Sequence, residues 1–212
     1  MIIYKLRNEV FVKTNIYSEK QLDLVVKDLS AGHIVAVATD TVMGLATISD
    51  SLEAYNELRK VKGHREDKPF PVMVANLSQL QLIVDLNSRD LKLIEKWFPG
   101  AITFVFNIKE NSNLQGLDKT VAIRMPDDPL LLSIVSKLNK PIFLTSANKS
   151  DETPTTKAKD VLEIFDGEIS SIIMRDASNY IASTIIDATN SQLKLLREGS
   201  ISLENVVESL EE

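Results

Sequence analysis

Apolar residues recur at helical spacing in several stretches of the chain. The first such face, which predicts a helix ending before Gly32, consists of Leu22, Val25, Val26 and Leu29. Ser18, with Gln21 three residues later, is the expected N-cap of this helix, and Asp50 with Glu53 predicts the start of the next one. Further helices are expected over residues 78–84, 90–97, 130–138 and 157–165 and around the C-terminal apolar face at 203–210.

Between these helices lie short runs of β-branched and aromatic residues that predict strands. Residues 34–37 are continuously apolar, which is typical of a strand buried on both faces. Other strands are expected at 70–75, 102–108, 121–124, 142–144, 171–174, 184–187 and 193–196. Helices and strands interleave without a regular βαβ repeat, so the pattern favours an α/β fold with a twisted mixed sheet, formed by one domain over residues 1–212.

Composition narrows the possible functions. The chain has 212 residues and a net charge of -6, which argues against indiscriminate binding to polyanions. It contains no cysteine and two histidines, so disulfides, thiol nucleophiles and a histidine-rich zinc site are excluded, and no metal site is expected on its own side chains. The sequence shows neither a signal peptide nor a long apolar run, and a cytoplasmic location without membrane contact is therefore expected.

Polar motifs follow several of the expected strands. Thr39 and Thr41 flank Asp40 directly after the first buried strand and can offer hydroxyl groups to one ligand, while Gly44 lets the backbone pass close by. The alternative is an ordinary turn, because Thr and Asp are common turn residues.

A second motif concentrates cations in one short loop. Lys62, Arg65 and Lys68 suit a triphosphate, whose oxygens are held by charge-assisted hydrogen bonds, and His64 lies among them. The alternative is a solvated basic turn balanced by the acidic residues at 66 and 67. The chain has no Gly-x-x-x-x-Gly-Lys-Ser/Thr or Gly-x-Gly-x-x-Gly motif, so an ordinary P-loop or Rossmann phosphate site is not expected.

Three polar residues stand at later strand ends. Arg124 can clamp a carboxylate or phosphate, or it can pair with Asp127 or Asp128. Ser146 and Asn148 can bind a ligand at the strand end, or they can cap the polar loop at 149–156. A nucleophilic role for the serine is not favoured, because the chain has no Gly-x-Ser-x-Gly elbow.

Taken in order, these motifs resemble the YrdC-like family, the L-threonylcarbamoyladenylate synthases. The resembling segments lie at residues 38–45, 62–69, 99–103, 121–126, 145–148, 183–187 and 197–199. The resemblance implies a single-domain YrdC-like α/β fold with a concave ligand cavity. It implies an enzyme that joins L-threonine, bicarbonate or CO2 and ATP into threonylcarbamoyl-AMP and releases pyrophosphate, with Mg²⁺ on the phosphates. A transferase complex would then modify tRNA.

The resemblance also implies roles for individual residues. The threonine substrate is expected to contact Thr39, Thr41, Arg124 and Ser183. ATP is expected to contact Lys62, Arg65, Lys68, Ser146, Asn148 and Arg197. Lys62, His64 and Arg65 are the expected catalytic residues, and catalysis would rest mainly on positioning and charge neutralisation.

The chain departs from the family pattern at several of these motifs. Ala38 replaces a proline, Met43 a tyrosine, His64 an arginine and Asp151 a glycine. Histidine near neutral pH is a weaker phosphate partner than arginine. These departures leave open an alternative function, a divergent paralogue that binds nucleotide or RNA, such as tRNA or double-stranded RNA, without synthase activity.

Overall fold

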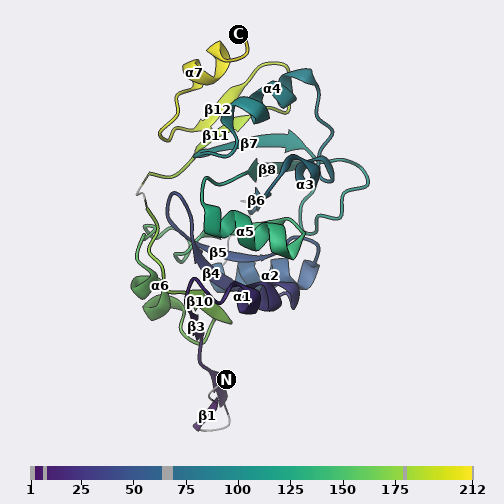
Figure 1. The fold of residues 1–212 in the computed structure, drawn as a ribbon. Helices are drawn as coiled ribbons and strands as arrows, with labels where there is room; N and C mark the ends of the chain where they lie inside the picture. Colours follow the sequence, from purple (N-terminus) through teal and green to yellow (C-terminus); the bar gives the residue numbers. More distant parts are fainter. Residues whose placement is uncertain (1–2, 7–8, 64–68, 179–180, 212) are drawn as a thin grey trace.

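A computed structural model describes residues 3–6, 9–63, 69–178 and 181–211, and for the strands before residue 13 it describes the backbone alone. A ten-stranded sheet forms the centre, in the order β12-β11-β7-β8-β6-β9-β5-β4-β10-β3 (Figure 1). Its strands, in chain order from β3 to β12, are Asn15–Tyr17, Val35–Ala38, Met43–Ile48, Val72–Met73, Ile102–Asn107, Thr120–Arg124, Ile142–Ser146, Ser171–Ile173, Thr184–Asp187 and Lys194–Arg197.

The sheet is mixed, as the sequence predicts. Strand β10 runs parallel to β3 and β4, β6 runs parallel to β8, and β11 runs parallel to β7. The remaining neighbours are antiparallel. All four residues of β4 are buried, which confirms the expected strand that has apolar neighbours on both faces.

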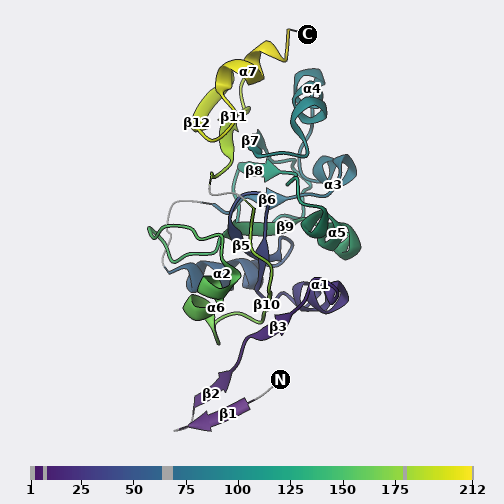
Figure 2. The same ribbon diagram turned by 60° about the vertical axis from the view of Figure 1, so that its left-hand side comes forward.

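Helices cover both faces of the sheet. The helices from α1 to α7 are Leu22–Ser30, Leu52–Lys62, Leu77–Gln81, Ser88–Trp97, Pro129–Leu138, Ala158–Phe165 and Leu203–Glu208. Helices α1 and α5 lie on one face and α2 and α6 on the other (Figure 2). The side chains of β4 follow this division, because Val35 and Val37 pack in the core cluster with α1 and α5, whereas Ala36 packs in the cluster with α2 and α6.

The expected helices are present, but two expected caps are wrong. Helix α2 is capped by Ser51, whose side chain accepts a hydrogen bond from Ala54 N, and not by Asp50. Helix α1 has no side-chain cap. Ser18 instead donates its hydroxyl to Gln21 Oε1, and this oxygen also accepts the Ser18 N–H, so the serine lies outside the helix.

Four strands were not expected from the sequence. Strands β1 (Ile3–Leu6) and β2 (Glu9–Val12) pair with each other in a two-stranded sheet that lies apart from the main one, near the N-terminus (Figures 1 and 2). Strand β3 is short, and β5 falls in a stretch expected to be a ligand loop. The assignment of residues 1–212 to a single YrdC-like domain stays a prediction. Within the described residues, no helix has the length and apolar character needed to cross a membrane.

Candidate functional site

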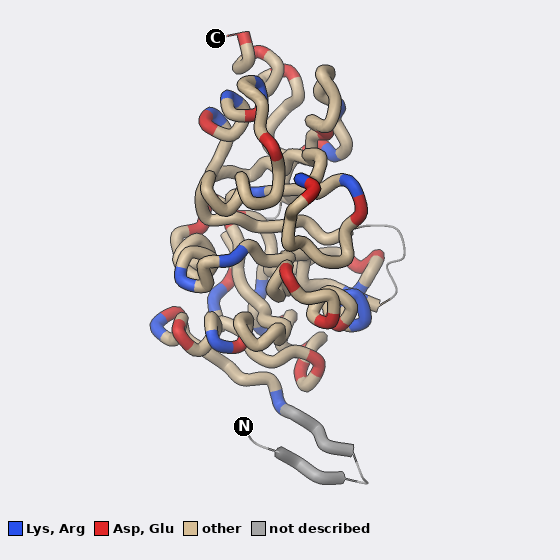
Figure 3. The backbone as a smooth tube through the Cα atoms, turned by 90° about the vertical axis from the view of Figure 1, so that its right-hand side faces the viewer, with Lys and Arg blue, Asp and Glu red and all other residues tan. Residues whose placement is uncertain are grey.

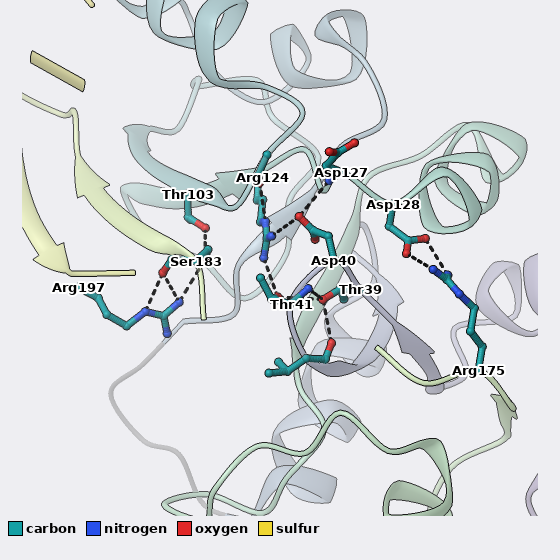
Figure 4. A network of polar contacts seen from close by, with 12 residues as sticks. Thr39, Asp40, Thr41, Thr103, Arg124, Asp127, Asp128, Arg175, Ser183 and Arg197 are labelled. Carbon is teal, nitrogen blue, oxygen red and sulfur yellow. Dashed lines mark hydrogen bonds and ion pairs between the residues drawn. The ribbon is translucent and has the colours of Figure 1, made fainter. Parts of the chain in front are cut away.

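Arg124, the last residue of β8, is buried at the centre of a polar cluster, with 4% of its surface exposed. Its Nε donates to the Gly100 carbonyl at 3.0 Å, one terminal nitrogen, Nη1, donates to Thr41 Oγ1 at 3.1 Å, and the other, Nη2, donates to Asp40 Oδ2 at 2.7 Å (Figure 4). The guanidinium is therefore fixed from three directions by the backbone of the β6-β7 connection and by the loop between β4 and β5.

Burial and charge act on Arg124 in opposite directions. Desolvation lowers the pKa of the guanidinium, and the adjacent Asp40 carboxylate raises it. Arginine stays protonated under both influences, because its ordinary pKa lies far above neutrality. The cluster thus holds a buried positive charge whose closest negative partner is one carboxylate.

The two threonine hydroxyls form one directed chain of hydrogen bonds. Thr39 Oγ1 donates to the Val42 carbonyl at 2.8 Å, so in the 2.9 Å contact between the hydroxyls the proton belongs to Thr41. Thr39 Oγ1 also accepts the Thr41 N–H at 3.0 Å. Both protons are committed to the loop, while Thr41 Oγ1, which accepts from Arg124, retains one lone pair for a ligand.

A second polar cluster surrounds Ser183 at the start of β11. Its hydroxyl lies 2.9 Å from Thr103 Oγ1 and accepts from Arg197 Nη2 at 3.2 Å, and its carbonyl accepts from the same guanidinium at 2.9 and 3.0 Å (Figure 4). Gly199 passes close to this turn, since a Cβ there would lie 2.4 Å from the Ala182 oxygen. Glycine at 199 thus lets β12 approach and hold Ser183 in place.

A third cluster joins the end of α2 to the end of β9. The Lys62 ammonium, almost completely buried, donates to the Ser146 carbonyl at 2.8 Å, to the Asn148 carbonyl, and to Asn148 Oδ1 at 3.3 Å. In return, Ser150 donates to the Lys62 carbonyl through its N–H at 2.8 Å and its hydroxyl at 3.0 Å. Asn148 Nδ2 donates to the carbonyls of Lys149 and Glu152. Lys62 and Asn148 therefore hold the polar loop in this structure, which is the alternative that the sequence left open for Asn148.

Backbone contacts connect the three clusters. Gly100, whose carbonyl accepts from Arg124, adjoins Ala101, whose carbonyl accepts the Thr184 N–H at 3.0 Å. On the other side, Ser146 pairs with Gly44 in the β5-β9 ladder. The described residues of the predicted site thus lie along one series of neighbouring strand ends. His64, Arg65 and Lys68 lie outside the described residues, and their roles stay predictions.

The structure corrects one alternative and adds contacts that the sequence did not indicate. Arg124 pairs with Asp40 and not with Asp127 or Asp128; Asp127 contributes its backbone N–H to Asp40 Oδ2 at 3.2 Å. Asp40 and Thr103 were not among the expected site residues. Thr103 had one signal in the sequence, because it is the last residue of the segment 99–103 that resembles the family pattern.

One departure from the family pattern has a conformational explanation. Asp151, which stands where the pattern has glycine, adopts φ of 67°. Aspartate is among the few residues other than glycine that tolerate this left-handed region. The backbone of the loop is therefore compatible with the substitution.

Two cavities in the described structure lie away from these clusters. One of about 450 Å³ is lined by Asn87, Arg89, Asn107 and residues 188–191, and another of about 360 Å³ lies beside Gly32, Glu53 and Ser170. The expected concave ligand cavity at the strand ends stays a prediction. Lys and Arg positions are interspersed with Asp and Glu along the described chain (Figure 3).

A mixed sheet flanked by helices, with buried hydroxyl and guanidinium groups at adjacent strand ends, defines an α/β domain suited to a small polar ligand. The Sua5/YciO/YrdC family model, described as "Telomere recombination", matches residues 27–199. The chain belongs to this family, and the YrdC-like fold expected from the sequence is confirmed.

Relatives with assigned names resemble most of the chain. A "Threonylcarbamoyl-AMP synthase" of Bacillus subtilis is 33% identical over 84% of this chain and 53% of its own length. The enzyme of the same name from Vibrio vulnificus (strain YJ016) is also 33% identical, over 84% of this chain and 98% of its own length. The chain therefore spans about half the length of the Bacillus relative and nearly all of the Vibrio one.

Solved structures share the fold. The Pyrococcus abyssi Sua5 complexed with L-threonine superposes with a TM-score of 0.82 and 28% identity, covering 93% of this chain and 60% of that one. Escherichia coli YciO gives a TM-score of 0.80 at 19% identity over 91% of this chain and 95% of that one, a likeness in fold alone.

Proposed function

We propose that this chain is an L-threonylcarbamoyladenylate synthase, a nucleotidyltransferase that makes threonylcarbamoyl-AMP and pyrophosphate from L-threonine, bicarbonate or CO2, and ATP. The names of its relatives, threonylcarbamoyl-AMP synthase, support this function, and so does the complex of a similar structure with L-threonine. The alternative, a nucleotide- or RNA-binding paralogue without synthase activity, is not favoured by these relatives.

The observation that carries the proposal is the unused hydrogen-bonding capacity of Arg124. Its contacts with Gly100, Thr41 and Asp40 use three of the five N–H groups of a guanidinium, so that among the described residues one N–H on each terminal nitrogen is left for a ligand. A carboxylate accepts two such N–H groups at once. Arg124 is thus the proposed clamp for the carboxylate of threonine, with Thr41 and Ser183 beside it.

The proposed chemistry has two bond-forming steps. The neutral amine of threonine attacks the carbon of CO2, one C=O electron pair moves to oxygen, and the nitrogen releases one proton to solvent, which leaves a carbamate. A carbamate oxygen then attacks the α-phosphorus of ATP, the bond between the α-phosphorus and the bridging oxygen breaks, and pyrophosphate leaves with its electron pair. Positioning of the three substrates and neutralisation of the phosphate charge supply the catalysis in this proposal.

The nucleotide is proposed to lie beside the Lys62 cluster. Ser146, Asn148 and Arg197 would hold it together with Arg65 and Lys68, and Mg²⁺ would accompany its phosphates. Lys62 donates to Ser146 and Asn148 carbonyls, so a direct contact with phosphate requires it to exchange one of these oxygens. In either arrangement Lys62 positions the end of β9, where Ser146 lies.

The product is proposed to serve tRNA threonylcarbamoyladenosine modification. A separate transferase complex would carry the threonylcarbamoyl group to tRNA, and the cytoplasm is the proposed location. Direct contact between this chain and tRNA or double-stranded RNA is not required by the proposed reaction.

The test is release of pyrophosphate from ATP by the purified protein with Mg²⁺. The expected result is release that requires both L-threonine and bicarbonate, together with a product of the mass of threonylcarbamoyl-AMP. A parallel His64→Arg variant tests the main departure from the family motif. Release by the variant alone would mean that the natural chain has lost the activity, and release by neither protein would reject the proposed function.

A further inference from the structure

One carboxylate oxygen of Asp40 accepts two hydrogen bonds, and the other accepts none from the described residues. Oδ2 accepts from Arg124 Nη2 at 2.7 Å and from the Asp127 N–H at 3.2 Å. Oδ1 is buried and has no hydrogen-bond partner among the residues that the structure describes. The side chain as a whole is 11% exposed. Since nearly all buried polar atoms in folded proteins have a partner, this oxygen is available to a donor from outside the described residues.

None of the described neighbouring groups donates to this oxygen. The proton of Thr39 goes to the Val42 carbonyl, and the proton of Thr41 goes to Thr39. Arg124 already donates to the other oxygen of the carboxylate. The unused groups around Arg124 are therefore two N–H donors on the guanidinium, one acceptor on Asp40 and one lone pair on Thr41.

This set is complementary to the zwitterionic head of an amino acid. The two donors match a carboxylate, and the acceptors match an amino group attached one carbon away. Because the Asp40 carboxylate is charged and buried, it bonds more strongly to an ammonium group than to a neutral hydroxyl. Without Asp40, the site would bind the carboxylate and leave the nitrogen free to rotate.

We propose that Asp40 Oδ1 accepts a hydrogen bond from the α-amino group of the amino-acid substrate and so orients the nitrogen that becomes carbamoylated. Asp40 is then a substrate-binding residue in addition to the partner of Arg124. The inference rests on the proposed function for the identity of the substrate, but its test measures binding and not synthesis.

The test is calorimetric titration of three ligands into the full chain and its Asp40→Asn variant. L-Threonine carries all three groups, L-2-aminobutyrate lacks the hydroxyl, and 3-hydroxybutyrate lacks the amine. In the variant, the amide oxygen can still accept from Arg124 and Asp127, whereas the NH2 group places a donor where Oδ1 was an acceptor. The control is Asp127→Asn, which removes the same charge from a residue that contacts Asp40 through its backbone only.

The expected result is that Asp40→Asn weakens L-threonine and L-2-aminobutyrate equally, by about tenfold or more, because a charge-assisted hydrogen bond is lost. The affinity for 3-hydroxybutyrate, titrated at high concentration, is expected to be the same in the two proteins, and Asp127→Asn is expected to bind all three like the natural chain. The Asp40→Ala variant, which removes the acceptor without adding a donor, should repeat this order if the asparagine variant is unfolded.

Three other binding outcomes overturn the inference. A loss for L-threonine but not for L-2-aminobutyrate would assign Oδ1 to the hydroxyl group. Equal losses for all three ligands would mean that Asp40 acts only through Arg124, and no loss would mean that Oδ1 contacts solvent. A chain that binds threonine through Asp40 yet releases no pyrophosphate would reject the synthase function and leave the role of Asp40 intact.

Discussion

Two pairs of arginine and aspartate lie close together in this fold and differ in how completely their carboxylates accept hydrogen bonds (Figure 4). Arg124 contacts Asp40 at 2.7 Å, and Arg175 contacts Asp128 at 2.5 Å. In the second pair both carboxylate oxygens accept from Arg175, and Oδ1 also accepts the Leu131 N–H at the start of α5. In the first pair, Oδ1 of Asp40 accepts no hydrogen bond among the described residues.

The pKa directions of the two arginines differ because Arg124 is more deeply buried than Arg175. Hydrogen bonding to Asp128 raises the pKa of Arg175, whereas burial lowers the pKa of Arg124 despite its carboxylate partner. A carboxylate with both oxygens bonded stabilises the fold, and a buried carboxylate oxygen without a partner is suited to a ligand. The comparison therefore separates a structural pair from a functional pair by the carboxylate oxygen that Asp40 leaves unused among the described residues.

The largest expected effect is a loss of activity when Arg124, in its pair with Asp40, is replaced. Arg124→Lys should lower kcat/KM for threonine by about 100-fold, because lysine keeps the charge but cannot present two parallel N–H groups. The measurement is threonine-dependent pyrophosphate release. Arg175→Lys, the matched control, should retain the activity of the natural chain, and equal losses in the two variants would remove the distinction between the pairs.

The second largest effect is a loss of stability when Asp128, in its pair with Arg175, is replaced. Asp128→Ala should lower the free energy of unfolding by about 2–4 kcal/mol, since among the described residues it leaves Arg175 with only the longer contact to Glu19 and removes the N-cap of α5. The estimate is at the lower end for a buried pair because the Arg175 side chain is 24% exposed. Urea unfolding measures it. Asp127→Ala should change stability by less than about 0.5 kcal/mol, as is usual for an exposed site, and a similar loss there would contradict the assignment.

A smaller effect isolates the contribution of a cap alone. Ser51→Ala should lower the free energy of unfolding by about 1 kcal/mol, because Ser51 caps α2 without taking part in an ion pair. Asp50→Ala, which removes a half-exposed contact with Lys140, should have a smaller effect. The reverse order would favour the cap expected from the sequence. The loss in the free energy of unfolding for Asp128→Ala, minus the loss for Ser51→Ala, approximates the contribution of the ion pair between Asp128 and Arg175.

The smallest expected effect is on the stability that the exposed pair of Lys157 and Asp176 provides. Its hydrogen bond to Lys157 lowers the pKa of Asp176, whose other oxygen accepts the Ala158 N–H at 2.9 Å. A lowered pKa in the folded state stabilises the fold above the unfolded pKa, and this stabilisation is lost as the pH falls through the folded value. Asp176→Asn should therefore unfold at a slightly lower temperature at neutral pH and at the same temperature in strong acid. A difference that persists in acid would contradict this account.

Periodic apolar patterns predicted most of the fold correctly, and short strands without a pattern were missed. The run at 34–37 and the apolar face from Leu22 to Leu29 are strong local signals, and both elements formed. Strand β5 was missed because glycine and alanine have low strand propensity. Its Gly44 is required by tertiary packing, since a Cβ there would lie 2.7 Å from Leu144 Cδ2, and no local pattern reveals such a contact.

The sequence predicted which residues lie at the candidate site, but it did not predict which of them contact one another. Arg124 and Thr41, which lie at or after the ends of expected strands, do contact each other, and Ser183, expected from the family resemblance, lies directly before β11. The partner of Arg124 is Asp40, which is distant in sequence, and the nearby Asp127 and Asp128 contact other groups. Sequence neighbours suggested the wrong pair, because the register of the sheet decides which loop ends meet.

Calorimetric titration of L-threonine into the natural chain, Arg124→Met and Arg175→Met tests the central claim most directly. We expect the natural chain and Arg175→Met to bind with equal affinity, and Arg124→Met to bind at least about 100-fold more weakly, because its carboxylate clamp is absent. Equal binding by Arg124→Met and the natural chain, or an equal loss in both variants, would contradict the assignment of the incompletely bonded pair to the substrate.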